Sequence, residues 1–522
     1  MLVTGDRILA VVPYGEETPY VDARTRVLDF GERMMMPGFV DAHTHFFMGA
    51  VAQSRHVCSE PVHARSEREC VEMMKRYAAS HPEEKRLRGR GWLVTNWENE
   101  EMPTKRSLDE AFPDIPVYMQ SEDAHCYWLN SKAIEECGIT AAMETETGYV
   151  GKDMDGEPNG LLVEIEASRP ADRMYHAFSE EEEYHVYRDF LRVVAENGIT
   201  SLSEMTLAEY GETEKQRYRI IRKMERRGEM TARLHVFPKL PVKETSCAEA
   251  AALRREFDST YFRISGLKGF IDGVLEAHTG LLLEPYTDLP QSRGVGVPTC
   301  SQQELNACVT EANREGFPVR LHCIADGSVR MALDAFEAAA RECGRTGLPN
   351  AIEHMEIMDP ADIPRFQELG VLPSMQPMHL LLGGSEIDRV GAARVKNEWL
   401  TKSLLHGSGG HLAIGTDCPV VALNPFDTIY AAVTRRYFDG SPASCNPEQA
   451  LTMAETLRAY TYGAAEAYSR QDELGSLEPG KYADITVIDR DLFAVPADEI
   501  RSRRVEWTMV GGRIVFEREK ER

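Results

Sequence analysis

Two histidines separated by one residue, His43 and His45, lie in the segment PGFVDAHTHF near the start of the chain. Alternate residues of a β-strand face the same way, so both imidazoles would project together, about 7 Å apart along the strand. Imidazoles placed in this way can bind one metal ion, and histidine and carboxylate ligands favour zinc. Because the chain has 15 histidines, the pair alone is weak evidence and needs support from elsewhere.

That support comes from four further candidate ligands, each at the carboxyl end of another predicted strand: Lys268, His322, His354 and Asp417. In a barrel of parallel strands such positions face the mouth, where catalytic groups gather. Each histidine taken singly is equally explained as a partly buried structural residue. A coincidence of so many strand ends is much harder to explain without a shared site.

The elements that must position these residues are short apolar runs alternating with amphipathic helical stretches. Such alternation is typical of an α/β fold with a parallel sheet. Eight runs closing on each other predict a (β/α)₈ TIM barrel. The runs are 36–46, 198–205, 232–238, 264–273, 318–327, 351–359, 371–377 and 411–419.

The long gap between His45 and Glu204 predicts a large insertion after the first strand, at about 60–180, since one βα unit needs only about 30 residues. Its aromatic residues, Trp97 among them, form either the insertion's own core or a lid over the substrate. Short strands at both ends predict a small β-sandwich made of 1–35 and 473–522, beside a barrel domain spanning 36–472.

The amino-acid composition argues against several classes of binding partner. The formal net charge is −25, which disfavours nucleic acid and acidic membranes as partners. We see no signal peptide and no apolar run long enough to span a bilayer. Eleven scattered cysteines without CxxC pairs indicate reduced thiols. We therefore expect a cytoplasmic enzyme with a small-molecule substrate; a homodimer is left open.

Nearly the whole chain resembles the metal-dependent amidohydrolase superfamily, and within it the amidohydrolase family 3 branch with its N-substituted formamide deformylase-like enzymes. The resemblance is carried by stretches in the family's order. They are PGFVDAHTHF, GWLVTNW, SEDAHCYWLNSKAI, GKDMDGEPNGLL, LKGFIDGVLEAHTGLLLEPYTD, VRLHCIADGSV, IEHMEIMDPADIPRFQELGVLPSMQPMH, AIGTDCPV and LGSLEPGKYADITVID.

The resemblance implies a centre with one or two divalent metal ions, Zn²⁺ by ligand type. Its ligands would be His43, His45, Lys268, His322, His354 and Asp417. With two ions, a carbamylated Lys268 would bridge them, because an unmodified ammonium offers a metal no lone pair; the alternative is one ion and an unmodified lysine. Asp417 would act as the catalytic general base and then general acid.

Substrate contacts are expected from Trp97, His125, Asp272, His278 and His379. His125 matches a histidine that the family places near substrate, whereas His278 replaces an arginine of many relatives. Relatives also usually carry more sequence before the first metal motif, so the natural start is expected to lie upstream of Met1 or the sandwich to lack an edge strand.

The function we expect is hydrolysis of an amide, N-acyl or N-formyl C–N bond by a hydroxide that the metal activates. One alternative is a one-metal deaminase of the same superfamily, favoured if Lys268 is unmodified. A non-catalytic scaffold is the other, and the retained ligand types argue against it.

Overall fold

The computed structural model describes residues 1–99, 101–122, 126–145, 148–206, 210–243, 246–289, 294–382, 386–444 and 446–519. The chain forms two compact units. Residues 1–46 and 191–522 make the first unit, and residues 47–190 make the second. The second unit contains the whole segment that the sequence predicts as an insertion.

Parallel strands form the centre of the first unit. One sheet has the order β12 (Phe262–Ile264), β11 (Arg233–Phe237), β10 (Ile199–Met205) and β4 (Phe39–Asp41). The other has the order β13 (Leu267–Phe270), β14 (Val319–Cys323), β15 (Ala351–His354), β16 (Leu372–Met375) and β17 (Ala413–Ile414). Each of the eight predicted apolar runs contains one of these strands; the run 264–273 contains β13 and only the last residue of β12.

The strands β12 and β13 are consecutive, and the chain changes its pairing partner between them, at Gly266. Before it, β12 pairs with β11, and after it, β13 pairs with β14. The backbone bends there closely against its neighbour, so that a Cβ on Gly266 would lie 2.5 Å from the Pro318 carbonyl oxygen. Only glycine fits this close approach.

Hydrogen bonds also join the outer edges of the two sheets. On one side Ala42 donates its N–H to the Ile414 oxygen at 3.1 Å. On the other, Leu240 donates to the Lys268 oxygen at 2.6 Å, and Lys268 donates to the Pro238 oxygen at 2.8 Å. The predicted α/β class with parallel sheets is confirmed, whereas closure of the two sheets into one (β/α)₈ barrel stays a prediction.

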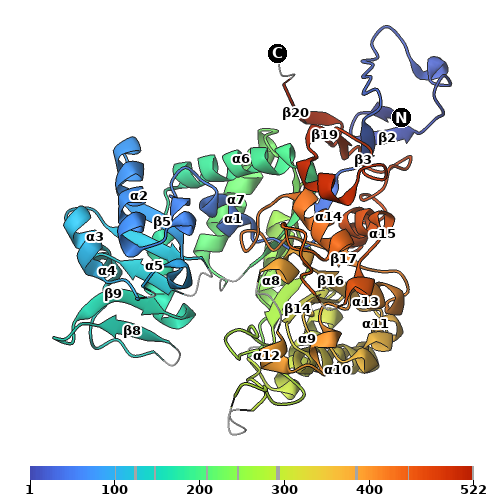
Figure 1. Cartoon of the computed structure of the whole chain (residues 1–522). Helices are drawn as coiled ribbons and strands as arrows, with labels where there is room; N and C mark the ends of the chain where they lie inside the picture. The colour runs from blue at the N-terminus through green and yellow to red at the C-terminus, as the bar shows by residue number, and fades with distance from the viewer. Residues whose placement is uncertain are drawn as a thin grey trace. The chain divides into compact units, whose positions relative to one another are not determined.

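Helices follow most of these strands along the chain, as a succession of βα units requires. Figure 1 shows α9, α10, α11 and α13 beside β14, β16 and β17. The helices of this unit are α7 (Glu212–Arg226), α8 (Ala248–Phe257), α9 (Gln302–Arg314), α10 (Asp326–Cys343), α11 (Ile363–Leu369), α12 (Ile387–Val390), α13 (Thr401–Gly407), α14 (Pro425–Thr434), α15 (Met453–Arg458) and α16 (Ala464–Glu466).

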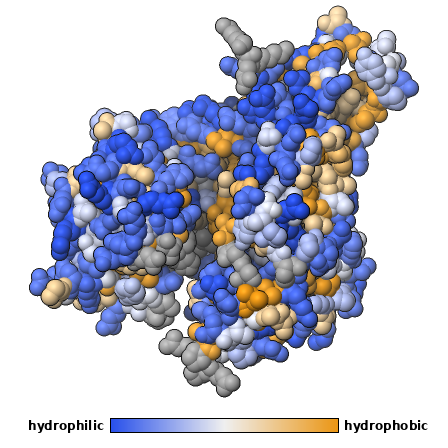
Figure 2. All heavy atoms as spheres, viewed as in Figure 1, coloured by the Kyte–Doolittle hydropathy of each residue, from blue (hydrophilic) through white to orange (hydrophobic). Residues whose placement is uncertain are grey.

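Both chain ends contribute to one antiparallel sheet, while the predicted β-sandwich domain of 1–35 and 473–522 stays a prediction. Its order is β20 (Arg513–Glu517), β19 (Val505–Val510), β18 (Ile485–Ile488) and β3 (Met34–Pro37). The hairpin of β1 (Leu2–Thr4) and β2 (Arg7–Ala10) buries Ile8 against the same apolar core as Trp507. Between β2 and β3 the chain is mostly exposed, and Val11 and Val27 are among its exposed apolar residues. Figure 2 shows apolar patches among the hydrophilic surface of the molecule.

The second unit has its own sheet and core. The sheet order is β5 (Leu87–Trp92), β6 (Val117–Ser121), β7 (Cys126–Leu129), β9 (Pro158–Val163) and β8 (Tyr149–Lys152). Its helices are α1 (Phe46–Ala52), α2 (Glu67–Ser80), α3 (Lys105–Ala111), α4 (Ser131–Cys137), α5 (Ile165–Tyr175) and α6 (Glu180–Glu196), the first and last of which cross the unit boundaries. Buried tryptophans meet in its core, with the rings of Trp92 and Trp97 6.0 Å apart and those of Trp97 and Trp128 6.4 Å apart.

Two further findings concern the described parts of both units. None of their helices combines the length and the apolar character needed to cross a membrane. The ten cysteines described are all free thiols.

Candidate metal centre

The carboxyl ends of β4 and β17 are tied together, which brings their polar residues to one place. Asp417 donates its backbone N–H to the His43 oxygen at 2.6 Å, and His45 donates to the Cys418 oxygen at 2.8 Å. The carboxylate of buried Asp41 accepts the Thr416 N–H at 2.9 Å and its hydroxyl at 2.8 Å. Residues more than 370 positions apart therefore share one rigid corner.

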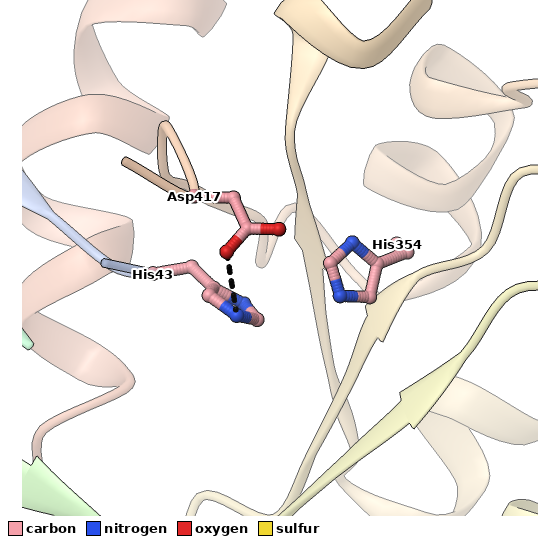
Figure 3. Close-up of side chains that lie close together, drawn as sticks. All are labelled: His43, His354 and Asp417. Atoms are coloured by element: carbon pink, nitrogen blue, oxygen red, sulfur yellow. Dashed lines mark ion pairs between the residues drawn. The ribbon is translucent and has the colours of Figure 1, made fainter. Parts of the chain in front are cut away.

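Three buried side chains in this corner have ligand atoms close enough for one metal ion. The ligand atoms of His43, His354 and Asp417 all lie within 4.8 Å of one another. Figure 3 shows these side chains converging from three different segments, with His43 Nε2 3.4 Å from Asp417 Oδ1. His45 belongs to the same group, since its Nε2 lies 3.0 Å from that oxygen.

His322 and Lys268 lie on the neighbouring strands. The His322 ring is 4.4 Å from that of His354. Lys268 is fully buried on β13, and its Nζ lies 4.9 Å from the centre of the Phe270 ring. Each sequence-predicted ligand lies in or just after a parallel strand: His43 and His45 after β4, Lys268 and His322 within β13 and β14, His354 ending β15, and Asp417 after β17. That all six bind metal at one centre stays a prediction.

Burial lowers the pKa of three histidines of the centre, His43, His322 and His354, and keeps them neutral, whereas the hydrogen bond and charge of Asp417 outweigh burial at His45 and raise its pKa. Burial and then the charge of Lys268 lower the pKa of His43 to about 4 and that of His322 to about 3. Burial raises the pKa of Asp417, but the nearby His43 and His45 outweigh it and hold that pKa below its ordinary value. Neutral imidazoles and an ionised carboxylate are the forms that bind metals.

Several donor atoms here are buried without a hydrogen-bond partner among the described residues. They are Nδ1 of His45, Nδ1 of His354 and Nζ of Lys268. Unpaired buried polar atoms are rare and costly, and a bound ion is one of the few things that accounts for a cluster of them. The residues present therefore fit a divalent metal.

A second layer of buried groups orients His43. Its Nδ1 lies 2.7 Å from Glu353 Oε2, so the ring donates that N–H to the carboxylate and turns the Nε2 lone pair toward Asp417. Arg320 Nε donates to Glu353 Oε1 at 2.6 Å, and Gln376 Nε2 donates to Glu353 Oε2 at 3.2 Å. Carboxylates that hold a ligand histidine in this way are a recurrent part of metal sites.

The sequence analysis missed Glu353. The available signal was a charged residue inside the buried apolar strand AIEH, next to His354. Charged side chains are almost never fully buried unless they are paired, so an acidic residue in that strand indicated a buried partner. The partner, Arg320, could not be named without the pairing of β14 with β15.

Two ligands have strained backbones. The φ angles of His354 and Asp417 are 73° and 63°, in the left-handed region that residues other than glycine rarely adopt. Such strain persists only where the surrounding structure enforces it, and it concentrates at functional sites. Here it turns both side chains toward the centre at the points where their strands end.

Among the predicted substrate residues, His379 lies nearest the centre. It follows β16, stacks on His354 with 5.7 Å between ring centres, and has its Nε2 3.6 Å from Asp417 Oδ2. His278 lies in the loop after β13 and pairs with Asp288 at 2.9 Å. Both are placed on the mouth side of the strands, and their contact with substrate stays a prediction.

Asp272 has a structural role that the sequence analysis did not anticipate. Its oxygens accept backbone N–H groups from Leu281, Ile324 and Ala325 at 3.0–3.2 Å. These bonds join the loops that follow β13 and β14, so any substrate contact would have to share oxygens already in use. Burial raises the pKa of this carboxyl to about 6.

Two of the predicted substrate residues, Trp97 and His125, belong to the predicted insertion. Trp97 is 4% exposed in the core of the second unit, which accounts for the aromatic cluster without any substrate. Its role as a pocket wall stays a prediction. His125 lies outside the described residues.

Comparisons with known proteins agree with this chemistry. Residues 26–516 match the amidohydrolase family. The N-substituted formamide deformylase of Arthrobacter pascens is 26% identical, over 99% of this chain and 95% of its own. The putative amidohydrolase YtcJ of Bacillus subtilis is 26% identical over 96% and 92%, respectively.

A solved structure is similar over most of its length as well. It is an uncharacterized metal-dependent hydrolase from Pyrococcus horikoshii, 26% identical, with a TM-score of 0.73 over 89% of this chain and 88% of the other. The family match covers well over half of the chain. The chain therefore belongs to the amidohydrolase family and is a metal-dependent hydrolase that acts on C–N bonds.

Proposed function

We propose that this enzyme hydrolyses an amide, N-acyl or N-formyl bond of a small molecule at a divalent metal centre in the mouth of a (β/α)₈ barrel. The observation that carries the proposal is the meeting of His43, His354 and Asp417, buried and within 4.8 Å in their ligand atoms. The name of the Arthrobacter pascens relative supports the bond type. Zinc suits a histidine and carboxylate ligand set.

We assign the following roles to the residues of the centre. His43, His45, His322 and His354 would hold the ion through their ring nitrogens. When bound, the ion acts as a Lewis acid that makes water nucleophilic at neutral pH and polarises the substrate carbonyl. Asp417 accepts the proton of the attacking water and returns it to the leaving nitrogen. The nearby His43 and His45 hold the pKa of Asp417 below its ordinary value, so the carboxyl is ionised, which is the form that a general base requires.

Lys268 is the residue that decides between one and two ions. Burial lowers its pKa to about 8, and its Nζ has no hydrogen-bond partner among the described side chains. A neutral amine can add CO₂ and release a proton, which converts it into a carbamate with two ligand oxygens. We propose this modification and a second ion; an unmodified lysine would leave one.

The test is a hydrolysis screen of N-formyl, N-acyl and cyclic amides with the purified enzyme after reconstitution with Zn²⁺, Mn²⁺ or Co²⁺. His43→Ala, checked for folding by circular dichroism, should lose metal and turnover together. A wild-type protein that binds none of these ions would refute the proposal. Ammonia release from amino-substituted heterocycles with one ion per chain would favour a deaminase instead.

A further inference from the structure

A cavity of about 150 Å³ lies between the carboxyl ends of β10 and β11 and the helices α7 and α8. Thr206 follows β10 there, and Pro238 follows β11. None of the predicted metal ligands lines it. Cavities of this size admit molecules as large as benzene, so the space suits a ligand of a few carbon atoms.

The cavity contains a buried acceptor that the described protein atoms leave unused. Glu214, on the first turns of α7, is 5% exposed and lines the cavity. Its Oε1 accepts a hydrogen bond from Arg217 at 2.7 Å, whereas Oε2 is buried and has no partner among the described residues. A carboxylate oxygen desolvated in this way needs an N–H or O–H donor.

The other lining residues define what kind of donor fits. Tyr218 and Leu253 are buried apolar walls, and Ala252 lies at the exposed side on α8. Three carboxylates line the cavity with two lysines, and two of the carboxylates, Glu214 and Glu212, also pair with Arg217 and Arg219. An ammonium group with a short carbon stem along the apolar walls would supply the N–H donor that the free oxygen of Glu214 lacks.

We propose that this cavity is a binding site for a small primary amine in its ammonium form, which donates an N–H to Glu214 Oε2. Because hydrolysis of a C–N bond releases an amine, the site would respond to product. That consequence rests on the proposed function, whereas binding itself does not.

The cavity is also connected to the predicted metal centre through the backbone of β10. Thr206 is two residues beyond Glu204, which is buried at the end of β10 and pairs with the backbone of His45. Met205 likewise donates its N–H to the Thr44 oxygen at 2.9 Å. A ligand in the cavity would therefore act on the strand that supports the histidine pair.

Binding is measured with butylammonium chloride as the probe, by titration in saturation-transfer difference NMR on the full-length, metal-loaded protein. 1-Butanol is the neutral probe of the same shape. We expect saturable binding of butylammonium, at least tenfold tighter than that of 1-butanol. Glu214→Gln should weaken it at least tenfold, while Glu256→Gln, an exposed change on α8 outside the cavity, should leave it unchanged.

Two further variants locate the site and protect the test against misfolding. Ala252→Trp places a large side chain over the cavity from an exposed helix position and should abolish binding. His43→Ala disables the predicted metal centre and should leave binding intact, so a failed proposal here is distinguishable from a failed metal centre. Absence of saturable binding, equal binding by Glu214→Gln, or loss in His43→Ala would each overturn the proposal.

Discussion

Replacing Glu353 by glutamine should have two effects that can be measured separately. One is on metal affinity, through the orientation of His43, and the other is on the free energy of unfolding, through Arg320. The substitution keeps the shape of the side chain but removes the charge that His43 and Arg320 share at 2.7 and 2.6 Å. All three side chains are almost completely buried, with exposures of 0–1%. Water therefore cannot replace the lost partner.

This burial sets the expected losses of metal affinity and of folding stability. Loss of a carboxylate that holds a ligand histidine lowers metal affinity by about 10- to 100-fold, or about 1.4 to 2.8 kcal/mol. Leaving Arg320 buried without its counter-ion lowers the free energy of unfolding by about 3 to 5 kcal/mol. The second effect should disappear largely in a double variant, Glu353→Gln with Arg320→Met, because neither charge then remains buried and unpaired.

The assays are competition with a metal chelator for affinity and urea unfolding of the metal-free protein for stability. The double variant should regain most of the stability lost in Glu353→Gln while its metal affinity stays low. If Glu353→Gln binds metal as tightly as the wild type, the carboxylate does not orient His43 and the reasoning is wrong. Recovery of metal affinity in the double variant would contradict it equally.

Other predictions test single groups. Asp417→Asn should lower kcat by about 10²- to 10⁴-fold through loss of its acid–base role; single-turnover kinetics with metal content matched to wild type would measure this, and a near-normal kcat would remove the assignment. Lys268→Arg cannot form a carbamate, so metal content by elemental analysis should fall from two ions to one; an unchanged ratio, or an unmodified intact mass of wild type at saturating bicarbonate, speaks against the bridge. The metal-free protein should lose stability as pH falls from about 6.5 to about 4. Over this range the unfolded chain takes up protons at His43 and His322 that the folded chain, with pKa values of about 4 and about 3, does not. Asp41 and Asp272, whose pKa values burial raises to about 7 and about 6, oppose this loss because the folded chain protonates them first. Urea unfolding at a series of pH values is therefore compared with that of His322→Asn, and an unchanged slope in this variant would show that His322 is not kept neutral.

The sequence predicted the parts of this protein that are local in the chain. Apolar runs located the parallel strands, and the polar residues at their ends located His43, His354 and Asp417. The bend at Gly266 and the bonds of Asp272 could not be predicted, because both depend on which backbone lies alongside. The pair of Arg320 and Glu353 is of the same kind, since neither residue reveals the other before β14 and β15 are known to be neighbours.

The sheet that joins both chain ends has a consequence for biosynthesis. β3 ends at Pro37, shortly before the first ligand, and pairs with β18 at Ile485–Ile488. Ribosomes add roughly 5 to 20 residues per second, so the segment that carries His43 waits roughly 20 to 90 s for the strand that anchors it. The nascent protein must keep these histidines from binding stray metal ions or neighbouring chains until translation is complete.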